Sequence, residues 1–412
     1  MVIAEESTKG KAPRAAPPPV GPHGDPRARV IVTGGETLGV LAGVRALATA
    51  GYETWVAVSE RGSYGARSRA AAGTVDVPDA ARDPEGFVMA LAKAAVRLTA
   101  AAVLPGTDKD LIAFAEQRAL VPEGLAVGAP PPAAVKRATD KSQLDAFAAA
   151  AGLQTPHTIP FECEQSATVT AGLGFPLVVK PLTSESRGAD GSLEHASGHL
   201  ARDEEELARA IAALPGDRWL AQPYLAGSLY AVCGLAWRGE VVCSEHQIAA
   251  RIWPRTGGNS AYAVTTARDE ELDEGVRRLV ATIGWEGIFQ VQFIRRGDET
   301  YLIDFNPRIY GSLALAVAAG LNLPALWVEL LRGGDPQTRD YRVGVRYREE
   351  ENDIRALGWL LAHGRLREAA SGVIPHRGTA HSVFSARDPG PLLTSFGKLV
   401  RIARRRDGMS GA

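Results

Sequence analysis

Polar side chains alternate along two short segments near residue 300. Gln290 and Gln292 share one parity in GIFQVQFIRR, Asp304 and Asn306 share one in ETYLIDFN, and Arg308 follows on the same parity. Mg²⁺ takes hard oxygen ligands and usually shares them with phosphate groups. A carboxylate, amide oxygens and a guanidinium on one surface therefore predict a site for Mg²⁺ and phosphates.

A β-hairpin would bring these side chains together. Gly297 and Asp298 supply the turn, and a turn centred there sets Gln292 beside Asp304. Because strand side chains alternate between two faces, the other face is expected to be apolar. The side chains expected on that face are Phe289, Val291, Phe293, Tyr301, Ile303 and Phe305.

Lysine is rare here, since only eight of the 46 basic residues are lysines. Lys141 falls in the first turn of a helix that Asp140 can cap, where a cation opposes the helix dipole. Lys180 ends an apolar strand, 175–181, and precedes a glycine-containing loop, 183–192. Backbone amides of such a loop contact phosphate oxygens, and a lysine neutralises them. Both lysines are candidate phosphate-binding residues, although a solvated surface position is the alternative for Lys141.

Length and composition describe an ordinary globular chain. Its 412 residues, 45% of them hydrophobic, suffice for two or three domains, and the net charge of −1 gives no support for nucleic acid or a membrane as partner. No apolar run is long enough to cross a bilayer, and the N-terminus lacks a signal segment. Cys163, Cys233 and Cys243 show no metal-binding spacing. A cytoplasmic protein with reduced thiols is expected.

The order of the elements predicts a multidomain protein that combines α/β and α+β parts. Residues 1–28 are rich in proline and small residues and are expected to be a disordered tail. Residues 29–130 alternate between strands and helices, which predicts a parallel α/β domain. The strands are expected at 28–35, 52–59 and 101–106, and the helices at 37–50, 84–98 and 109–119.

Glycines follow the first of these strands, at 34, 35 and 39, but they do not match G-x-G-x-x-G. Ser59 stands at the end of the second strand, where a dinucleotide site would have an acidic residue. The turn at 33–35 is therefore interpreted as structural or ligand-facing rather than as a dinucleotide site.

The proline-rich stretch 129–137 marks a boundary, after which residues 131–340 form a second domain. Its expected elements are a helix at 202–214, an antiparallel sheet with strands near 218–222, 229–237 and 240–247, a loop at 251–266, a helix at 269–283, and two helices within 312–334. Residues 341–412 are expected to form a C-terminal α+β subdomain.

Several of these motifs in this order resemble the ATP-grasp superfamily, in its carbamoyl-phosphate-synthase-like branch. The resemblance runs from about Val135 to Leu331, roughly half of the chain. The segments that carry it are DK at 140–141, FPLVVKP at 175–181 with its glycine loop, QPYLAG at 222–227, PRTGGNS at 254–260, and VQFI, YLIDFNPR and AAGLNLP within 291–324. It implies a pre-ATP-grasp α/β domain followed by an ATP-grasp fold.

The resemblance also implies ATP and Mg²⁺ as cofactors and assigns residues to them. The implied nucleotide-binding residues are Lys141, Lys180, Gly188, Gly191, Ser192, Gln222, Pro223, Tyr224 and Leu225. The implied Mg²⁺ ligands are Gln292, Asp304 and Asn306. Arg308 would face the transferring phosphoryl group, and Lys180 would act in catalysis as well as in binding.

The chain departs from the superfamily pattern at three places. Leu229 stands where many members carry a glutamate for the ribose hydroxyls, and Asp304 replaces the commoner glutamate at the metal. The glycine loop also contains the additional charges Glu185, Arg187 and Asp190.

Charged residues near the predicted antiparallel sheet are candidates for substrate recognition: Glu245, His246, Arg251 and Arg255. An arginine there can hold a substrate carboxylate through two hydrogen bonds, and Arg255 is our candidate in the catalytic site. Structural or surface charge stays open as the alternative for both arginines, and a partnered structural histidine for His246.

The expected activity is that of an ATP-dependent carboxylate-amine ligase, which forms an amide or peptide bond through an acyl phosphate and releases ADP and phosphate. Its partners would be a small-molecule carboxylate and an amine, and the resemblance is compatible with a homodimer. Two alternatives stay open. One is a carboxyphosphate-forming enzyme that activates bicarbonate, although no biotin-attachment or glutaminase-like segment is recognised, and the other is a non-catalytic ATP-binding protein.

Overall fold

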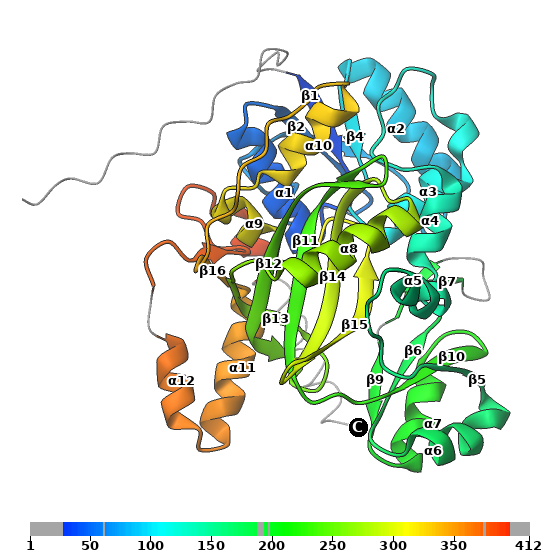
Figure 1. The fold of residues 1–412 in the computed structure, drawn as a ribbon. Helices are drawn as coiled ribbons and strands as arrows, with labels where there is room; N and C mark the ends of the chain where they lie inside the picture. Colours follow the sequence, from blue (N-terminus) through cyan, green and yellow to red (C-terminus); the bar gives the residue numbers. More distant parts are fainter. Residues whose placement is uncertain (1–27, 61, 188–192, 197, 374–375, 396–412) are drawn as a thin grey trace, which may run out of the picture.

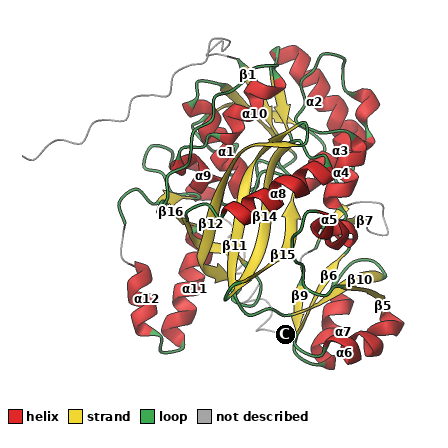
Figure 2. Cartoon of the chain, viewed as in Figure 1, coloured by secondary structure: helices red, strands yellow, loops and turns green. Residues whose placement is uncertain are grey.

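The computed structural model describes residues 28–395, except for 61, 188–192, 197 and 374–375. Almost all of the tail expected at 1–28 therefore lies outside the described residues. An N-terminal α/β region, a small sheet with its helices and a large sheet make up the molecule (Figure 1). Helices cover the N-terminal and small sheets, so the predicted mixed α/β multidomain architecture is confirmed (Figure 2).

The N-terminal region is a parallel sheet in the order β3-β2-β1-β4. Its elements are β1 (Arg29–Val32), α1 (Leu38–Thr49), β2 (Glu53–Val58), β3 (Ala71–Asp76), α2 (Pro84–Leu98), β4 (Ala102–Leu104) and α3 (Asp108–Glu116). Val30, Ile31 and Val32 are fully buried, as expected for a central parallel strand with both faces covered. The sequence predicted these elements except β3.

Gly39 explains part of the glycine pattern after β1. A Cβ atom at this position would lie 2.3 Å from the carbonyl oxygen of Tyr310, so only glycine lets α1 approach that backbone. Tyr310 follows Arg308 in the chain by two residues, and Gly39 therefore helps to hold the segment that carries this arginine.

A break in the pattern of strands and helices was expected at residues 129–137. Helix α4 (Pro132–Thr139) instead begins within this stretch, with proline in its first turn. Proline is favoured at that position because an amide there has no hydrogen-bond partner within the helix. The missing N–H of proline therefore costs no hydrogen bond. Arg137 Nε donates to the carbonyl of Ile283, which ties α4 to the end of α8 (Glu270–Ile283).

The small sheet has the order β5-β10-β6-β9 and packs on two helices. Its elements are β5 (Ile159–Glu162), α6 (Ser166–Leu173), β6 (Leu177–Pro181), β9 (His199–Ala201), α7 (Glu204–Ala213) and β10 (Arg218–Pro223). Between β6 and β9, β7 (Glu185–Arg187) pairs with β8 (Leu193–His195). The expectation of a continuous loop over 183–192 is therefore wrong at residues 185–187.

The large sheet has the order β15-β14-β11-β12-β13-β16-β17. Its strands are β11 (Ser228–Trp237), β12 (Glu240–Trp253), β13 (Asn259–Thr265), β14 (Gly287–Arg296), β15 (Glu299–Asn306), β16 (Arg346–Arg348) and β17 (Ala380–His381). Two expectations are corrected. β10 belongs to the small sheet rather than beside β11, and the loop expected at 251–266 contains the end of β12 and all of β13, because Pro254 and the two glycines confine the turn to 254–258.

The hairpin of β14 and β15 has the predicted register, since Gln292 lies opposite Asp304 and Gln290 opposite Asn306. An irregularity follows Gln292, so that Phe293 pairs with Leu302. The extra residue reverses the alternation beyond this point.

The predicted apolar face of the hairpin is therefore only partly right. Phe289, Val291, Phe293 and Phe305 are buried as expected, but Leu302 takes the core position. Ile303 lines a cavity instead, and the prediction that Tyr301 and Ile303 continue the apolar face is wrong. A strict period of two does not reveal an inserted residue.

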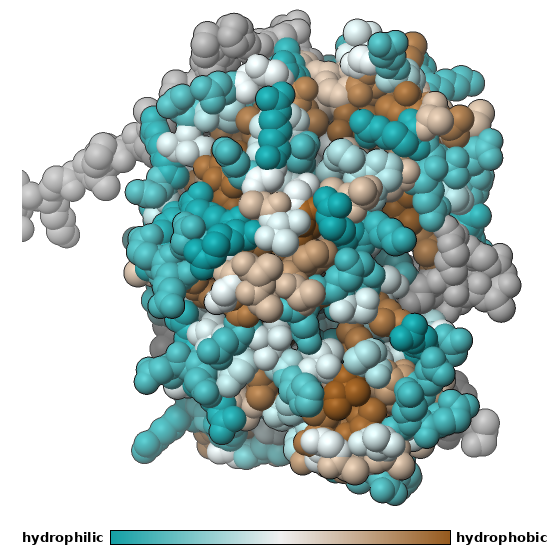
Figure 3. All heavy atoms as spheres, turned by 45° about the vertical axis from the view of Figure 1, so that its right-hand side comes forward, coloured by the Kyte–Doolittle hydropathy of each residue, from teal (hydrophilic) through white to brown (hydrophobic). Residues whose placement is uncertain are grey.

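The remaining helices are α9 (Leu313–Ala319), α10 (Leu323–Leu331), α11 (Glu350–Ala362) and α12 (Leu366–Val373). Helix α11 packs on β12 and β13, and α12 lies beside it at the outer edge of the molecule (Figure 1). Among the described helices none spans a membrane by its own length and composition, and α9 with α10 would do so only as a pair, which is bent by 89°. Polar residues cover most of the face in Figure 3, with apolar residues in smaller patches.

Candidate functional site

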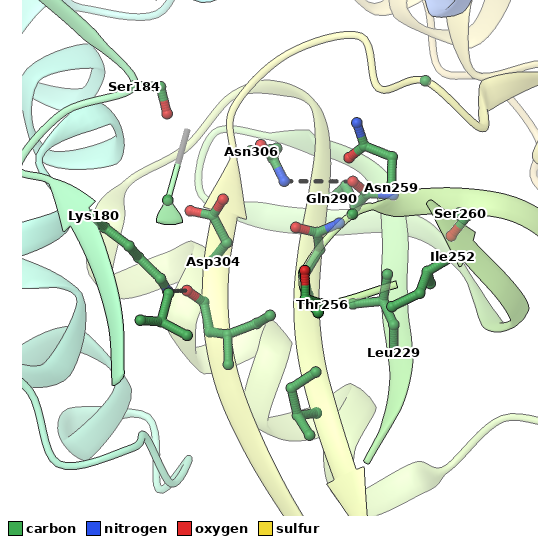
Figure 4. A pocket seen from close by; sticks show the side chains of 18 of the residues that line it. Lys180, Ser184, Leu229, Ile252, Thr256, Asn259, Ser260, Gln290, Asp304 and Asn306 are labelled. Atoms are coloured by element: carbon green, nitrogen blue, oxygen red, sulfur yellow. Dashed lines mark hydrogen bonds between the residues drawn. The ribbon is translucent and has the colours of Figure 1, made fainter. Parts of the chain in front are cut away.

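A cavity of about 460 Å³ lies between the small and the large sheet. The small sheet contributes residues of β6, β9 and β10, and the large sheet contributes residues of β11 to β15, so the cavity requires both (Figure 4). The predicted residues that line it are Lys141, Lys180, Gln222, Pro223, Tyr224, Leu225, Gln292, Asp304, Asn306 and Arg308. Segments from residue 141 to residue 308 thus meet around one space.

Two lysines and one carboxylate form the charged centre of this cavity. Lys141 Nζ lies 3.0 Å from Asp304 Oδ1, and Lys180 Nζ donates to the carbonyl of Ile303 at 3.0 Å. Burial lowers the pKa of Lys180 to about 8, with Lys141 adding to the effect and Asp304 and Asp145 opposing it. The positive charge of this buried ammonium is only partly offset by nearby carboxylates, so the site is suited to bind an anion such as phosphate.

Local structure explains how each lysine is presented. Along β6, Leu177, Val179 and Pro181 are buried, which turns Lys180 toward the cavity. Lys141 begins a short 3₁₀ helix, Lys141–Gln143, whose N-cap Asp140 accepts a hydrogen bond from the Ser142 amide. The predicted cap is confirmed, although the α-helix itself, α5 (Leu144–Ala150), starts one turn later.

The oxygen ligands predicted for Mg²⁺ lie on the same hairpin surface. Asp304 and Gln292 are cross-strand neighbours, and Asn306 follows on the same side. No group of three His, Cys, Asp or Glu residues that could hold a metal is found in the described part of the chain. A metal here would therefore depend on one carboxylate, two amides and the oxygens of a phosphate. This donor set fits Mg²⁺, and the ammonium of Lys141 shows that Asp304 already attracts a cation.

Arg308 connects the cavity to the N-terminal region. Its Nε donates to Asp108 Oδ2 at 2.9 Å, and its Nη2 donates to Asn306 Oδ1 at 3.3 Å. Burial opposes the charge of Arg308, but the carboxylates of Asp108, Asp304 and Glu185 together outweigh it and raise the pKa of this guanidinium. Asp108 lies in the first turn of α3 and is 4% exposed. The sequence missed it because nothing local pairs residues 200 positions apart.

Apolar residues line the part of the cavity where the nucleotide base is predicted to bind. Pro223, Tyr224 and Leu225 continue from β10, and Leu229 at the start of β11 is 8% exposed. Leu229 offers no acceptor for a ribose hydroxyl, so the departure noted in the sequence is a feature of the cavity wall. Gln222 is held by donating to Thr158 Oγ1 at 2.8 Å.

The structure does not bring the other predicted substrate-binding residues into the cavity lining. Arg255 stacks on Trp359, with its Cζ 4.2 Å from the ring centre. Arg251 Nε is bonded to Asp353 Oδ1 at 2.6 Å, which ties β12 to α11. The partners of His246 lie on the other face of the sheet and are Tyr230, Asp273 and the amide of Asp269, as in its structural interpretation.

Other residues also line the cavity. Thr256, Asn259 and Ser260, which were not predicted, come from the turn and strand that were expected to be loop. Gln290 was predicted on the polar face of the hairpin but not among the metal ligands. The C-terminal part contributes Tyr347, Glu349 and Asn352, which no sequence motif indicated. Gly188, Gly191 and Ser192 lie outside the described residues, while Ser184 of the same loop lines the cavity.

Glu245 lies fully buried on β12 beside Cys233. Burial raises the pKa of its carboxyl from 4.5 to about 8, while Cys233 lowers it slightly. The folded protein thus holds this proton more tightly than the unfolded chain does. Stability gained in this way is complete below about pH 4.5 and is lost as the pH rises toward about 8.

We therefore expect Glu245→Gln to raise the melting temperature over wild type by an amount that grows from pH 5 to pH 8. For a chain of 412 residues, each kcal/mol corresponds to roughly 1 °C. Thermal unfolding monitored by circular dichroism at several pH values measures this, with the exposed Glu240→Gln on the same strand as control. A difference that does not change with pH would contradict the buried protonated carboxyl.

A family model described as "ATP-grasp in the biosynthetic pathway with Ter operon" matches residues 216–353. The carbamoyl phosphate synthase large chain of Vibrio parahaemolyticus is 24% identical over 236 residues, which cover 54% of this chain and 21% of that one. The Vibrio cholerae protein of the same name is 26% identical over 202 residues, covering 46% and 18%. The chain thus spans about a fifth of the length of these curated relatives.

Solved structures share the fold over most of the chain. An ADP complex of N5-carboxyaminoimidazole ribonucleotide synthetase aligns with a TM-score of 0.60 at 14% identity, covering 78% of this chain and 80% of the other. An L-amino acid ligase from Bacillus licheniformis aligns with a TM-score of 0.55 at 17% identity, covering 74% of each. Biotin carboxylase from Campylobacter jejuni aligns with a TM-score of 0.58 at 15% identity, covering 78% and 75%.

Proposed function

We propose that this ATP-grasp protein is an ADP-forming carboxylate-amine ligase that acts on small metabolites. The proposal rests on one observation: Lys141, Lys180 and Arg308 converge on Asp304 and its neighbouring amides in a single cavity. A reaction that brings ATP and a carboxylate together must offset the charge of two anions, and this cavity supplies three cations for it.

In the proposed reaction, an oxygen of the substrate carboxylate attacks the γ-phosphorus of ATP, and the bond to the leaving ADP oxygen breaks. The resulting acyl phosphate is attacked by an amine nitrogen, which displaces phosphate and loses a proton as the amide forms. Lys180 and Lys141 bind and orient the phosphates, and Arg308 offsets charge on the transferring group. Both lysines are partly buried. A partly buried site limits the access of water, which would otherwise hydrolyse the acyl phosphate.

Gln292, Asp304 and Asn306 are the residues that we propose to hold Mg²⁺. When bound with ATP, this ion would polarise phosphoryl oxygens and neutralise part of their charge. The apolar strand end at 223–225 would hold the adenine ring. A cytoplasmic location and a homodimer remain predictions that accompany this proposal.

The likeness to a carboxyaminoimidazole ribonucleotide synthetase and to a biotin carboxylase keeps a bicarbonate-activating enzyme as the second candidate. The two candidates differ in the substrates that they need to release ADP. A ligase requires a carboxylate and an amine, whereas a carboxyphosphate-forming enzyme consumes ATP with bicarbonate.

Substrate-dependent ADP release tests the proposal. The full chain is incubated with ATP, Mg²⁺ and a panel of amino acids and other small carboxylates, singly and in pairs, and ADP is measured by a coupled assay. We expect ADP only with a carboxylate and an amine together, and none when EDTA removes Mg²⁺. ADP formed with bicarbonate alone supports the second candidate. ATP binding without turnover on the whole panel, and with affinity unaffected by Asp304→Ala, would indicate a non-catalytic ATP-binding protein.

A further inference from the structure

A chain of hydrogen bonds begins in the cavity lining at Asn306, one of the residues proposed to hold Mg²⁺. Asn306 Nδ2 donates to Gln290 Oε1 at 3.4 Å, as Figure 4 shows. The two residues are direct cross-strand partners of β15 and β14, and they are 7% and 9% exposed. Gln290 Nε2 in turn points to Cys233 Sγ at 3.6 Å.

We propose that Gln290 is a positioning residue that fixes the side-chain amide of Asn306, so that its oxygen rather than its nitrogen is available to the metal. This inference rests on the proposed function, because it assumes that ATP and Mg²⁺ bind in this cavity. Gln290 itself was not among the ligands that the sequence predicted.

The side-chain amide of asparagine is nearly symmetric in shape. Its oxygen and nitrogen are nearly equal in size, so a half-turn of the group changes the packing little but replaces an acceptor with a donor. Mg²⁺ requires oxygen ligands, and a nitrogen that carries hydrogens at that position would repel it. An asparagine ligand therefore needs neighbours that distinguish its two ends.

Both neighbours of Asn306 select the same orientation. Gln290 accepts from Nδ2 on one side, while Arg308 Nη2 donates to Oδ1 at 3.3 Å on the other. Since a guanidinium has only N–H donors, it can form a hydrogen bond only with the oxygen of the Asn306 amide. The oxygen consequently lies on the side of Arg308, and the nitrogen lies on the side of Gln290.

Gln290 can select the orientation of Asn306 only if its own side-chain amide has a defined orientation. The contact of Gln290 Nε2 with Cys233 Sγ defines it. Burial raises the pKa of the Cys233 thiol well above its usual value, so the sulfur stays a neutral, weak acceptor. Gln247 Nε2 also donates to this sulfur, at 2.8 Å, and to Ser312 Oγ at 2.9 Å. With two amide NH₂ groups pointing to the sulfur, the oxygen of Gln290 is left for Asn306.

The experiment measures the metal-dependent gain in ATP affinity, which is the ratio of the dissociation constants for ATP in EDTA and in Mg²⁺. Isothermal titration calorimetry on the full chain gives both constants for wild type, Gln290→Met, Asn306→Ala and the double variant. Methionine keeps the length of glutamine but has no oxygen to accept from Asn306. We expect Gln290→Met to reduce the ratio by about tenfold or more while the constant in EDTA stays unchanged.

The double variant separates positioning from a direct or structural role. If Gln290 acts through Asn306, Gln290→Met causes no further loss once Asn306 is alanine. A Gln290→Met protein with the wild-type ratio, one that binds ATP equally less well with and without Mg²⁺, or losses that add fully in the double variant would each overturn the inference. A wild-type protein that binds no ATP would instead overturn the proposed function, and this inference with it.

Discussion

Replacing Asp304 with asparagine should abolish ATP turnover, with a loss of at least about a hundredfold. Asp304 is the carboxylate that faces Lys141 at 3.0 Å, and it shares the hairpin surface with Gln292 and Asn306. Asparagine keeps the shape but removes the charge that would hold Mg²⁺. It also releases the ammonium of Lys141, so ATP binding in EDTA should be retained or become tighter. Initial rates of ADP release and ATP titrations in EDTA and in Mg²⁺ check the two effects.

Asp298→Asn is the matched control for this variant. Asp298 lies exposed at the turn of the same hairpin, outside the cavity lining, and its replacement should leave turnover at the wild-type level. The Asp304→Asn protein should unfold near the wild-type temperature, since the pair it breaks is partly solvated. Turnover that survives in Asp304→Asn would show that Asp304 is not part of a required metal site. A protein that fails to fold would show that Asp304 is structural.

Lys180→Met should also remove turnover and weaken ATP binding by about tenfold or more, because the ammonium would contact phosphate directly. The same variant should be as stable as wild type or more so. Burial makes the charge of Lys180 costly, as its pKa of about 8 shows, and a methionine of similar length has no charge to bury. Opposite effects on binding and stability are the signature of a residue kept for a ligand.

Lys136→Met serves as the control for this second variant, since Lys136 is an exposed residue of α4 that does not line the cavity. ATP titration and thermal unfolding are measured on both proteins. If Lys180→Met binds ATP as wild type does but melts at a clearly lower temperature, Lys180 serves the fold through its bond to the Ile303 carbonyl. The proposed phosphate role would then be wrong.

Local patterns were sufficient for the centre of the site. Alternating polar residues and a glycine turn determine the hairpin and set Gln292 opposite Asp304, because hairpin register follows from strand period and turn position. Lys180 is placed by the alternation of β6, and Lys141 by the cap that Asp140 provides. These features depend on residues that are close in the chain, at most the length of one hairpin apart, and the sequence therefore predicted them.

Packing decided what local patterns leave open. Because of the bulge after Gln292, Leu302 lies in the core and Ile303 lines the cavity, which is the reverse of the predicted alternation. Both side chains are apolar, so their chemistry does not distinguish the two places. Strand β10 joins the small sheet, and residues 251–266 complete β12 and form β13, because available strand edges and not local composition choose the partner.

Only the tertiary structure supplied the partners of Arg308 and Asn306. Asp108 reaches Arg308 from another region of the chain, and Glu349 and Asn352 close the cavity from a segment without a motif. Gln290 was visible in the sequence as one more polar residue of the hairpin, yet its contacts with Asn306 and Cys233 appear only when three strands pair. The sequence by itself determined which groups are candidates for the proposed chemistry, while long-range packing, which no local pattern encodes, decided what orients them.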